Sequence, residues 1–109
     1  MKMLNKIAVV LILFAISIPA FANTELCSNM SRYAEVVVES RYRGVEMRRH
    51  FEEIIPQQDN EVAKGLMSAI VRDAYNLPYM NAESNQQQQK QEFGDNIFAF
   101  CIGQFAEDV

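Results

Sequence analysis

The feature that most constrains this fold is a pair of cysteines, Cys27 and Cys101, near the two ends of the chain. A disulfide requires the two Cα atoms to lie within about 7 Å. Small exported domains use disulfides to support marginal cores, and two cysteines allow a single internal pairing. Closing a loop of about 75 residues stabilises the fold by about 4 kcal/mol. We predict an internal Cys27–Cys101 disulfide; two free buried thiols or bridges between chains are the alternatives.

The first 22 residues have the layout of a secretory signal peptide. Lys2 and Lys6 give a positive start, residues 7–18 are apolar except for one serine, and residues 20–22 place alanines before a cut after Ala22. The apolar run is about 12 residues, whereas a spanning helix needs about 20. We predict a cleaved signal peptide, with an uncleaved anchor as the alternative. Its brevity resembles bacterial precursors, which indicates a periplasmic or secreted protein.

The remaining part, residues 23–109, has the length of one domain. It carries all 14 acidic residues but, without Lys2 and Lys6, only 8 of the 10 basic residues, so its net charge is −6. Nucleic acids and anionic lipids bind basic surfaces. We therefore expect no nucleic-acid partner. Because no apolar run after residue 22 approaches the length of a spanning helix, we also expect no stable membrane insertion after signal cleavage.

Helical spacing dominates the chain, and strand patterns are nearly absent. A first apolar stripe contains Met30, Tyr33, Val37, Ser40, Gly44, Met47, Phe51 and Ile54. A second stripe, between Pro56 and Pro78, contains Val62, Leu66, Ala69, Ile70 and Ala74. Asp59 or Asn60 suits the start of that second helix, and Ser84 or Asn85 the start of a last one. The last helix would open with a solvated glutamine run, for which disorder is the alternative.

The disulfide decides whether the first stripe is one helix or two. In a three-helix bundle Cys101 would lie about 24 Å along the last helix, at the wrong end to reach Cys27. A helix end at Gly44 removes the conflict, and Arg41 and Arg43 would complement the helix dipole there. We predict an all-α bundle of four short helices closed by the disulfide, over about 24–42, 45–55, 59–77 and 85–107. Three helices, the last turning back across the bundle, are the alternative.

Several short motifs resemble a group of small exported bacterial helical proteins of unknown function. They are Cys27, an Arg-x-x-Gly turn at Arg41–Gly44, an Ala-Tyr-x-x-Pro element at Ala74–Pro78, and Cys101. The resemblance covers nearly the whole mature chain, although members often carry Gln where this chain has Tyr42. It implies a helical, disulfide-closed architecture. It implies no catalytic residue and no activity.

No catalytic, metal or cofactor motif stands out, and we expect a non-enzymatic protein. The single histidine, His50, has Glu46 and Glu53 at helical spacing, a weak arrangement for a metal. We interpret His50 as a surface residue. No serine lies in a nucleophile-elbow motif.

One basic cluster lies in this acidic chain, and it is a candidate anion site made of Arg41, Arg43, Arg48 and Arg49. Arginine suits carboxylates and phosphates. The preferred interpretation is surface ion pairing, because Glu39–Arg43, Arg48–Glu52 and Arg49–Glu53 are spaced i,i+4. We expect the Arg41 stem to be buried and its head to bind carbonyls at the break near Gly44.

The last helix is apolar around its circumference between residues 97 and 102. One stripe contains Phe93, Ile97, Phe100 and Cys101, and a second contains Phe98, Ile102, Phe105 and Val109. Such a helix is either central or shared with a partner; we prefer coverage by neighbouring helices. The alternative is a candidate partner surface made of Phe98, Ile102, Phe105, Tyr79 and Met80.

These observations favour an exported protein that binds another envelope protein or peptide, in an unknown oligomeric state. A periplasmic acid-stress chaperone is an alternative. The size, the helix content and the single disulfide are similar to those of small periplasmic chaperones that unfold at low pH. An inhibitor or accessory of an envelope hydrolase is a further alternative.

Overall fold

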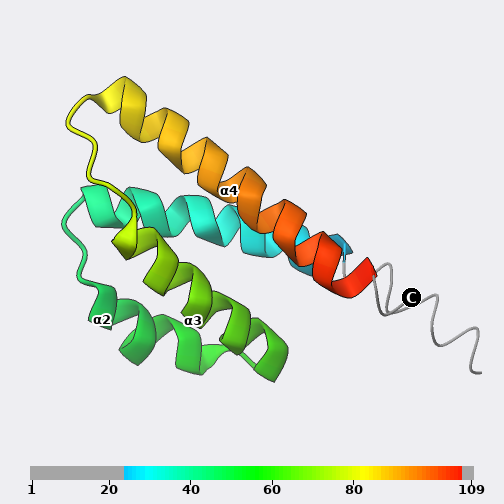
Figure 1. The fold of residues 1–109 in the computed structure, drawn as a ribbon. Coiled ribbons are helices and arrows are strands. Elements are labelled where there is room, and N and C mark those ends of the chain that lie inside the picture. The colour runs from blue at the N-terminus through cyan, green and yellow to red at the C-terminus, as the bar shows by residue number, and fades with distance from the viewer. Residues whose placement is uncertain (1–23, 107–109) are drawn as a thin grey trace, which may run out of the picture.

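The computed structural model describes residues 24–106, and every regular element among them is helical (Figure 1). The first helix covers residues 24–42. A second helical segment starts as α2 (Met47–Arg49), continues as the π-helix η1 (His50–Ile54) and ends as the 3-10 helix η2 (Ile55–Gln57). Two longer helices follow, α3 (Glu61–Asn76) and α4 (Glu83–Ala106). The predicted all-α bundle of four helices is confirmed, while the predicted signal peptide lies outside the described residues.

The first helix ends at Gly44, as the disulfide argument required. Gly44 has a φ of +86°, a left-handed conformation that glycine adopts without steric cost. The Val45 N–H donates to the carbonyl of Ser40, with an N···O distance of 2.9 Å, and the Gly44 N–H donates to the carbonyl of Arg41 at 3.1 Å. These two bonds form a Schellman motif. The apolar stripe therefore continues in phase across a real helix end, and the three-helix alternative is wrong.

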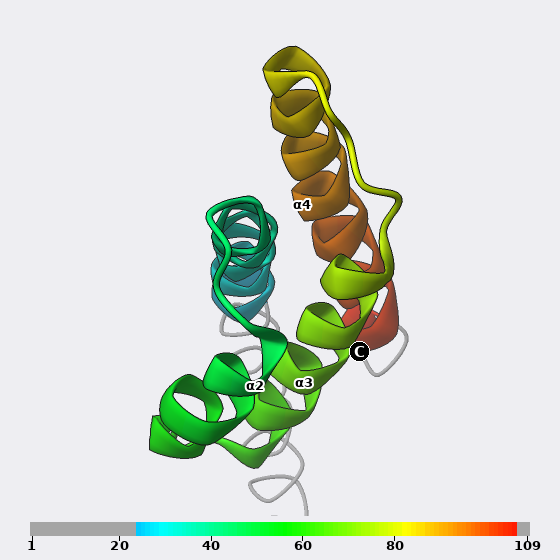
Figure 2. The ribbon, with the colours of Figure 1, turned by 90° about the vertical axis from the view of Figure 1, so that its left-hand side faces the viewer.

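The direction of the chain alternates from one helical segment to the next (Figure 1). The last helix therefore returns its C-terminal half to the start of the first helix. Cys27 and Cys101 are joined in a disulfide with a Cα–Cα distance of 5.5 Å, which confirms the predicted pairing. Figure 2, a view nearly along the helices, shows α3 between α2 and α4. The covalent link thus closes a bundle whose first and last helices are neighbours.

The core lies mainly between the first helix and α3. The first helix buries Met30, Ala34, Val37 and Val38. The buried face of α3 consists of Ala63, Met67, Ile70, Val71 and Ala74. The predicted α3 stripe was partly wrong, because Val62 is 50% exposed and Ala69 is also exposed. Both residues lie at the side of the buried face. The predicted stripe was therefore rotated about the helix axis, toward solvent, relative to the face that is buried.

The helix starts follow local capping chemistry at α3 but differ from expectation at α4. Asn60 caps α3, because its side-chain oxygen accepts bonds from the backbone N–H groups of Val62 and Ala63. The last helix begins at Glu83, before the expected caps Ser84 and Asn85. Its first turn is bonded to the preceding connection, since the Gln86 N–H donates to the Ala82 carbonyl at 3.0 Å.

Candidate functional site

An apolar groove between α3 and α4 is the most distinctive surface feature of the described residues. It has a volume of about 560 Å³, within the range typical of ligand sites. Its apolar walls include Leu66, Ile70 and Leu77 from the α3 side and Phe93, Ile97 and Phe100 from α4. Cys101 also lines it, so the disulfide that fixes α4 to the first helix also positions one wall of the groove.

Phe100 leaves the groove incompletely covered. Its side chain is 59% exposed, although Phe93 and Cys101 on the same stripe are buried. The expectation that neighbouring helices cover both stripes of the last helix is therefore wrong at Phe100. The reason is topological, because α4 lies at the edge of the bundle, where the disulfide ties it to the first helix (Figure 2).

Polar groups along the groove are few. Asp73 and Asn76 contribute from α3, and Asn96 contributes from α4. Asp73 is the one charged residue among the described lining residues, and its side chain takes part in no ion pair or hydrogen bond within residues 24–106. The groove therefore combines an apolar surface with one unpaired negative charge.

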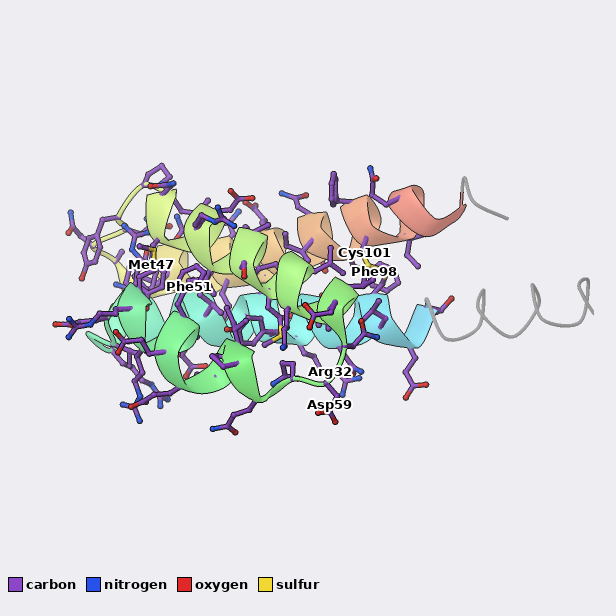
Figure 3. The ribbon with its side chains drawn as sticks, turned by 90° about the horizontal axis from the view of Figure 1, so that it is seen from below. Arg32, Met47, Phe51, Asp59, Phe98 and Cys101 are labelled. Carbon is purple, nitrogen blue, oxygen red and sulfur yellow. A yellow bond between two sulfur atoms is a disulfide. The ribbon has the colours of Figure 1, made fainter. Side chains whose placement is uncertain are left out.

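The structure separates the residues of the predicted partner surface. Phe98 lies near Cys101 in the C-terminal half of α4, at the opposite end of the bundle from the connection between α3 and α4 (Figure 3). Phe98 and Ile102 are half-buried. Tyr79 is 60% exposed in the connection, where Met80 is half-buried, and the side chain of Phe105 lies outside the described part of the structure. The α4 wall of the groove is formed by the stripe of Phe93, Ile97, Phe100 and Cys101, and not by the predicted partner surface.

Arg41 joins the two short sequence motifs. Its Nη1 donates to the carbonyl oxygens of Ala74 and Leu77, at 3.0 and 2.7 Å. In return the Tyr75 hydroxyl donates to the carbonyl of Val45 at 2.6 Å. The expectation that Arg41 binds carbonyls near Gly44 was wrong: it binds two carbonyls at the end of α3, and that of Ala74 also accepts the Leu77 N–H at 3.3 Å. The Arg-x-x-Gly turn and the Ala-Tyr-x-x-Pro element thus hold each other.

Gln89 anchors the connection that leads into α4. Its side chain is 8% exposed, and its amide nitrogen donates to the Pro78 carbonyl at 2.7 Å. The Tyr42 hydroxyl donates to the Gln89 amide oxygen at 2.5 Å and accepts from the Met80 N–H at 3.0 Å. The Gln86 side chain donates to the Met80 carbonyl at 2.9 Å. The glutamine run is therefore helical, but it is not wholly solvated as expected.

His50 is buried, which contradicts the interpretation as a surface residue. It is 1% exposed, and its Nδ1 lies 2.9 Å from the Tyr33 hydroxyl oxygen. Its ring makes edge contacts with the rings of Tyr33 and Tyr75, at centroid distances of 5.8 and 6.1 Å. Its Nε2 is buried and has no hydrogen-bond partner among the described residues. The helix turns this residue inward, while Glu46 and Glu53 stay exposed.

Burial governs the titration of this aromatic cluster. It raises the pKa of Tyr33 to about 12, with a smaller contribution from Tyr75. It also raises the pKa of Tyr75, which the charge of Arg41 partly opposes. The pKa of His50 is lowered, first by burial and then by the positive charge of Arg49. All three groups are therefore held in their neutral forms.

The candidate anion site is divided between two places. Arg41 is bound to the end of α3, whereas the other three arginines lie around a polar hollow beside Gly44. There the three expected pairs form, with N···O distances of 2.7 Å for Arg43–Glu39, 3.6 Å for Arg48–Glu52 and 2.8 Å for Arg49–Glu53. Their side chains are largely exposed, so each pair contributes little stability.

Residues 24–106 contain neither a metal-binding cluster nor a membrane-spanning helix. No group of three or more His, Cys, Asp or Glu side chains there could hold a metal ion. No helix in the same range is long and apolar enough to cross a bilayer. No family model matches the chain, and neither does a curated protein or a solved structure.

Proposed function

We propose that this chain is a non-enzymatic exported bacterial protein that binds a basic, amphipathic helix of another envelope protein in the α3–α4 groove. The observation that carries the proposal is Phe100, a large aromatic side chain left 59% exposed beside a mostly apolar groove. Exposed apolar patches of this kind mark interaction sites, and aromatic residues dominate binding energy when a partner covers them. The disulfide fits an oxidising compartment, and the signal-like residues 1–22 give the export route.

The dimensions of the groove suit a short helix. From Leu66 to Leu77 the α3 wall is about 16 Å long, and from Phe93 to Cys101 the α4 wall is about 12 Å, at 1.5 Å per residue. A partner helix of about three turns would match these lengths. Such a helix presents apolar anchors at i, i+3, i+4 and i+7 along one face. The walls themselves are helices, which can pack against a third helix by ordinary ridge-and-groove contacts.

The charge of the groove determines the preferred sign of the partner. Asp73 lines it without an ion-pair partner, and none of the lining residues that the structure describes is basic. The region after residue 22 has a net charge of −6. A lysine or arginine beside the apolar anchors would meet Asp73, and opposite charges increase the association rate. A basic amphipathic helix therefore fits better than an acidic one.

A direct test uses a defined peptide. A designed helical peptide with leucines at i, i+3, i+4 and i+7 and flanking lysines is titrated into methyl-labelled mature protein. We expect resonances of Ile70, Leu77 and Ile97 to shift. Phe100→Ser should weaken binding by about 5- to 150-fold, because truncating a central aromatic anchor costs about 1–3 kcal/mol.

Val36→Ser is the matched control. Val36 is 52% exposed on the first helix, outside the groove, so binding should not change. Asp73→Lys should weaken binding at low ionic strength and have less effect at high salt. Equal affinities for the Phe100 and Val36 variants would place the peptide elsewhere and contradict the proposal.

A further inference from the structure

The buried His50 cluster is separate from the groove and suggests a second property. We propose that His50 is an acid-sensitive latch: its neutral ring holds residues 47–57 against the first helix and α3, and protonation releases this segment. The inference does not rest on the proposed partner, because no groove residue takes part in the His50 contacts.

Besides His50, residues 47–57 are anchored by the buried Ile55 and by Phe51 and Ile54, which are half-buried and pack against the core. Across α2, η1 and η2 the only buried residues are His50 and Ile55. The hydrogen-bond pattern changes twice within these eleven positions, from α to π to 3-10, and Pro56 has no N–H to continue it. Short segments with few buried contacts open at low free-energy cost. A titratable ring is thus one of two fully buried anchors of the segment.

The surroundings of the buried His50 ring make its protonation unfavourable. Its Nδ1 pairs with the Tyr33 hydroxyl at 2.9 Å, and its Nε2 has no partner among the described residues. A protonated ring carries N–H groups on both nitrogens. One of them would be buried without an acceptor, and the positive charge would be desolvated.

The charged and titratable groups around His50 do not compensate a positive ring. Tyr33 faces it from the first helix, and Tyr75 faces it from α3 with its hydroxyl donated to the Val45 carbonyl. Arg49, on its own segment, adds like charge. The nearby acidic groups are Glu46, which immediately precedes the segment, and Glu53 within it.

Glu46 and Glu53 are exposed and already paired. The Glu53 carboxylate lies 2.8 Å from Nε of Arg49, and the Glu46 carboxylate lies 3.5 Å from an Nη atom of Arg48. Their side chains are 61% and 76% exposed, whereas the His50 ring is 1% exposed. A proton on Nε2 therefore meets no buried counter-charge.

Linkage gives the direction and the size of the effect. The pKa of His50 is lowered in the closed state, first by burial and then by Arg49, whereas in the open state it is close to 6.5. The stabilising contribution is therefore complete above pH 6.5 and is lost as the pH falls below it. In the limit where only the open state binds the proton, the opening constant rises about 25-fold between pH 7 and pH 5.

The test uses the mature protein, in which His50 is the sole histidine. Its ring protons give one NMR titration, and we expect a midpoint below 6.5. Amide exchange, corrected for the intrinsic pH dependence, should show residues 47–57 losing protection between pH 7 and pH 5, by up to about 25-fold. The first helix and α3, whose cores do not titrate, should keep their protection.

His50→Phe separates the latch from general acid effects. The variant keeps an aromatic ring but cannot titrate, so protection of residues 47–57 should become nearly independent of pH over this range. If the variant does not fold, the titration and exchange of the native protein decide the question. A midpoint at or above 6.5, unchanged protection at pH 5, or an equal loss in His50→Phe would overturn the proposal.

Discussion

Replacing Gly44 with alanine tests how the chain is divided into helices. Gly44 has a φ of +86°, and an added Cβ would meet nothing within 4 Å. Packing therefore contributes nothing, and the cost is the backbone penalty for a left-handed residue with a Cβ, about 1–2 kcal/mol. We expect Gly44→Ala to lower the free energy of unfolding by that amount. Gly44→Asn should cost less, because asparagine tolerates this conformation better.

Gly65 supplies the matched control. It is exposed within α3, has no positive φ, and an added Cβ there also meets nothing within 4 Å. Gly65→Ala should stabilise the protein by up to about 1 kcal/mol. Any effect of alanine on the unfolded chain is shared by both variants, so the two should differ by about 1–3 kcal/mol. Urea unfolding followed by circular dichroism is the assay, since the chain has no Trp; a stabilised Gly44→Ala would refute the helix end at this position.

Two further predictions concern the cross-links of the bundle. The denatured, unreduced protein should show no free thiol, and replacing Cys27 and Cys101 together with serine should lower the free energy of unfolding by about 4 kcal/mol; an unchanged urea midpoint would show that the core is sufficient alone. Gln89→Ala should cost about 1–3 kcal/mol because it leaves buried polar partners unpaired, whereas the exposed Gln87→Ala should change stability by less than about 0.5 kcal/mol. Equal effects of the two glutamine variants would contradict the anchoring role of Gln89.

The helix count was predictable because a covalent constraint acted on a periodic pattern. Periodicity alone favours one long helix through Gly44, and only the reach of the Cys27–Cys101 bridge requires the break. Asn60 likewise follows from capping chemistry. The three ion pairs of Arg43, Arg48 and Arg49 depend on i,i+4 spacing, and this spacing can be read directly from the sequence.

The contacts between helices were not predictable in the same way. Arg41 binds carbonyls 33 and 36 positions away, and Gln89 reaches the Pro78 carbonyl, so their roles depend on helix packing. The burial of His50 depends on the rotation of a segment whose π-helix shifts its phase. One signal was available for the glutamine run: Gln86 and Gln89 are spaced i,i+3 and share a helix face.

The groove was missed because its wall is a stripe that sequence assigns to the core. Phe93, Ile97, Phe100 and Cys101 have the spacing of a buried face, and only the position of α4 at the outside of the bundle leaves Phe100 exposed. An apolar pattern predicts that a helix face is buried. It does not predict whether the same chain or a partner buries that face.

The most direct measurement for the proposed binding is photo-crosslinking in living cells. A photoreactive phenylalanine analogue replaces Phe100 in one strain and Val36 in a control strain, and the crosslinked partner segments are sequenced by mass spectrometry. The proposal predicts that position 100 alone captures a single partner, through a segment with apolar residues at helical spacing and a nearby lysine or arginine. Equal capture from both positions, or crosslinks to acidic segments without an apolar face, would contradict it.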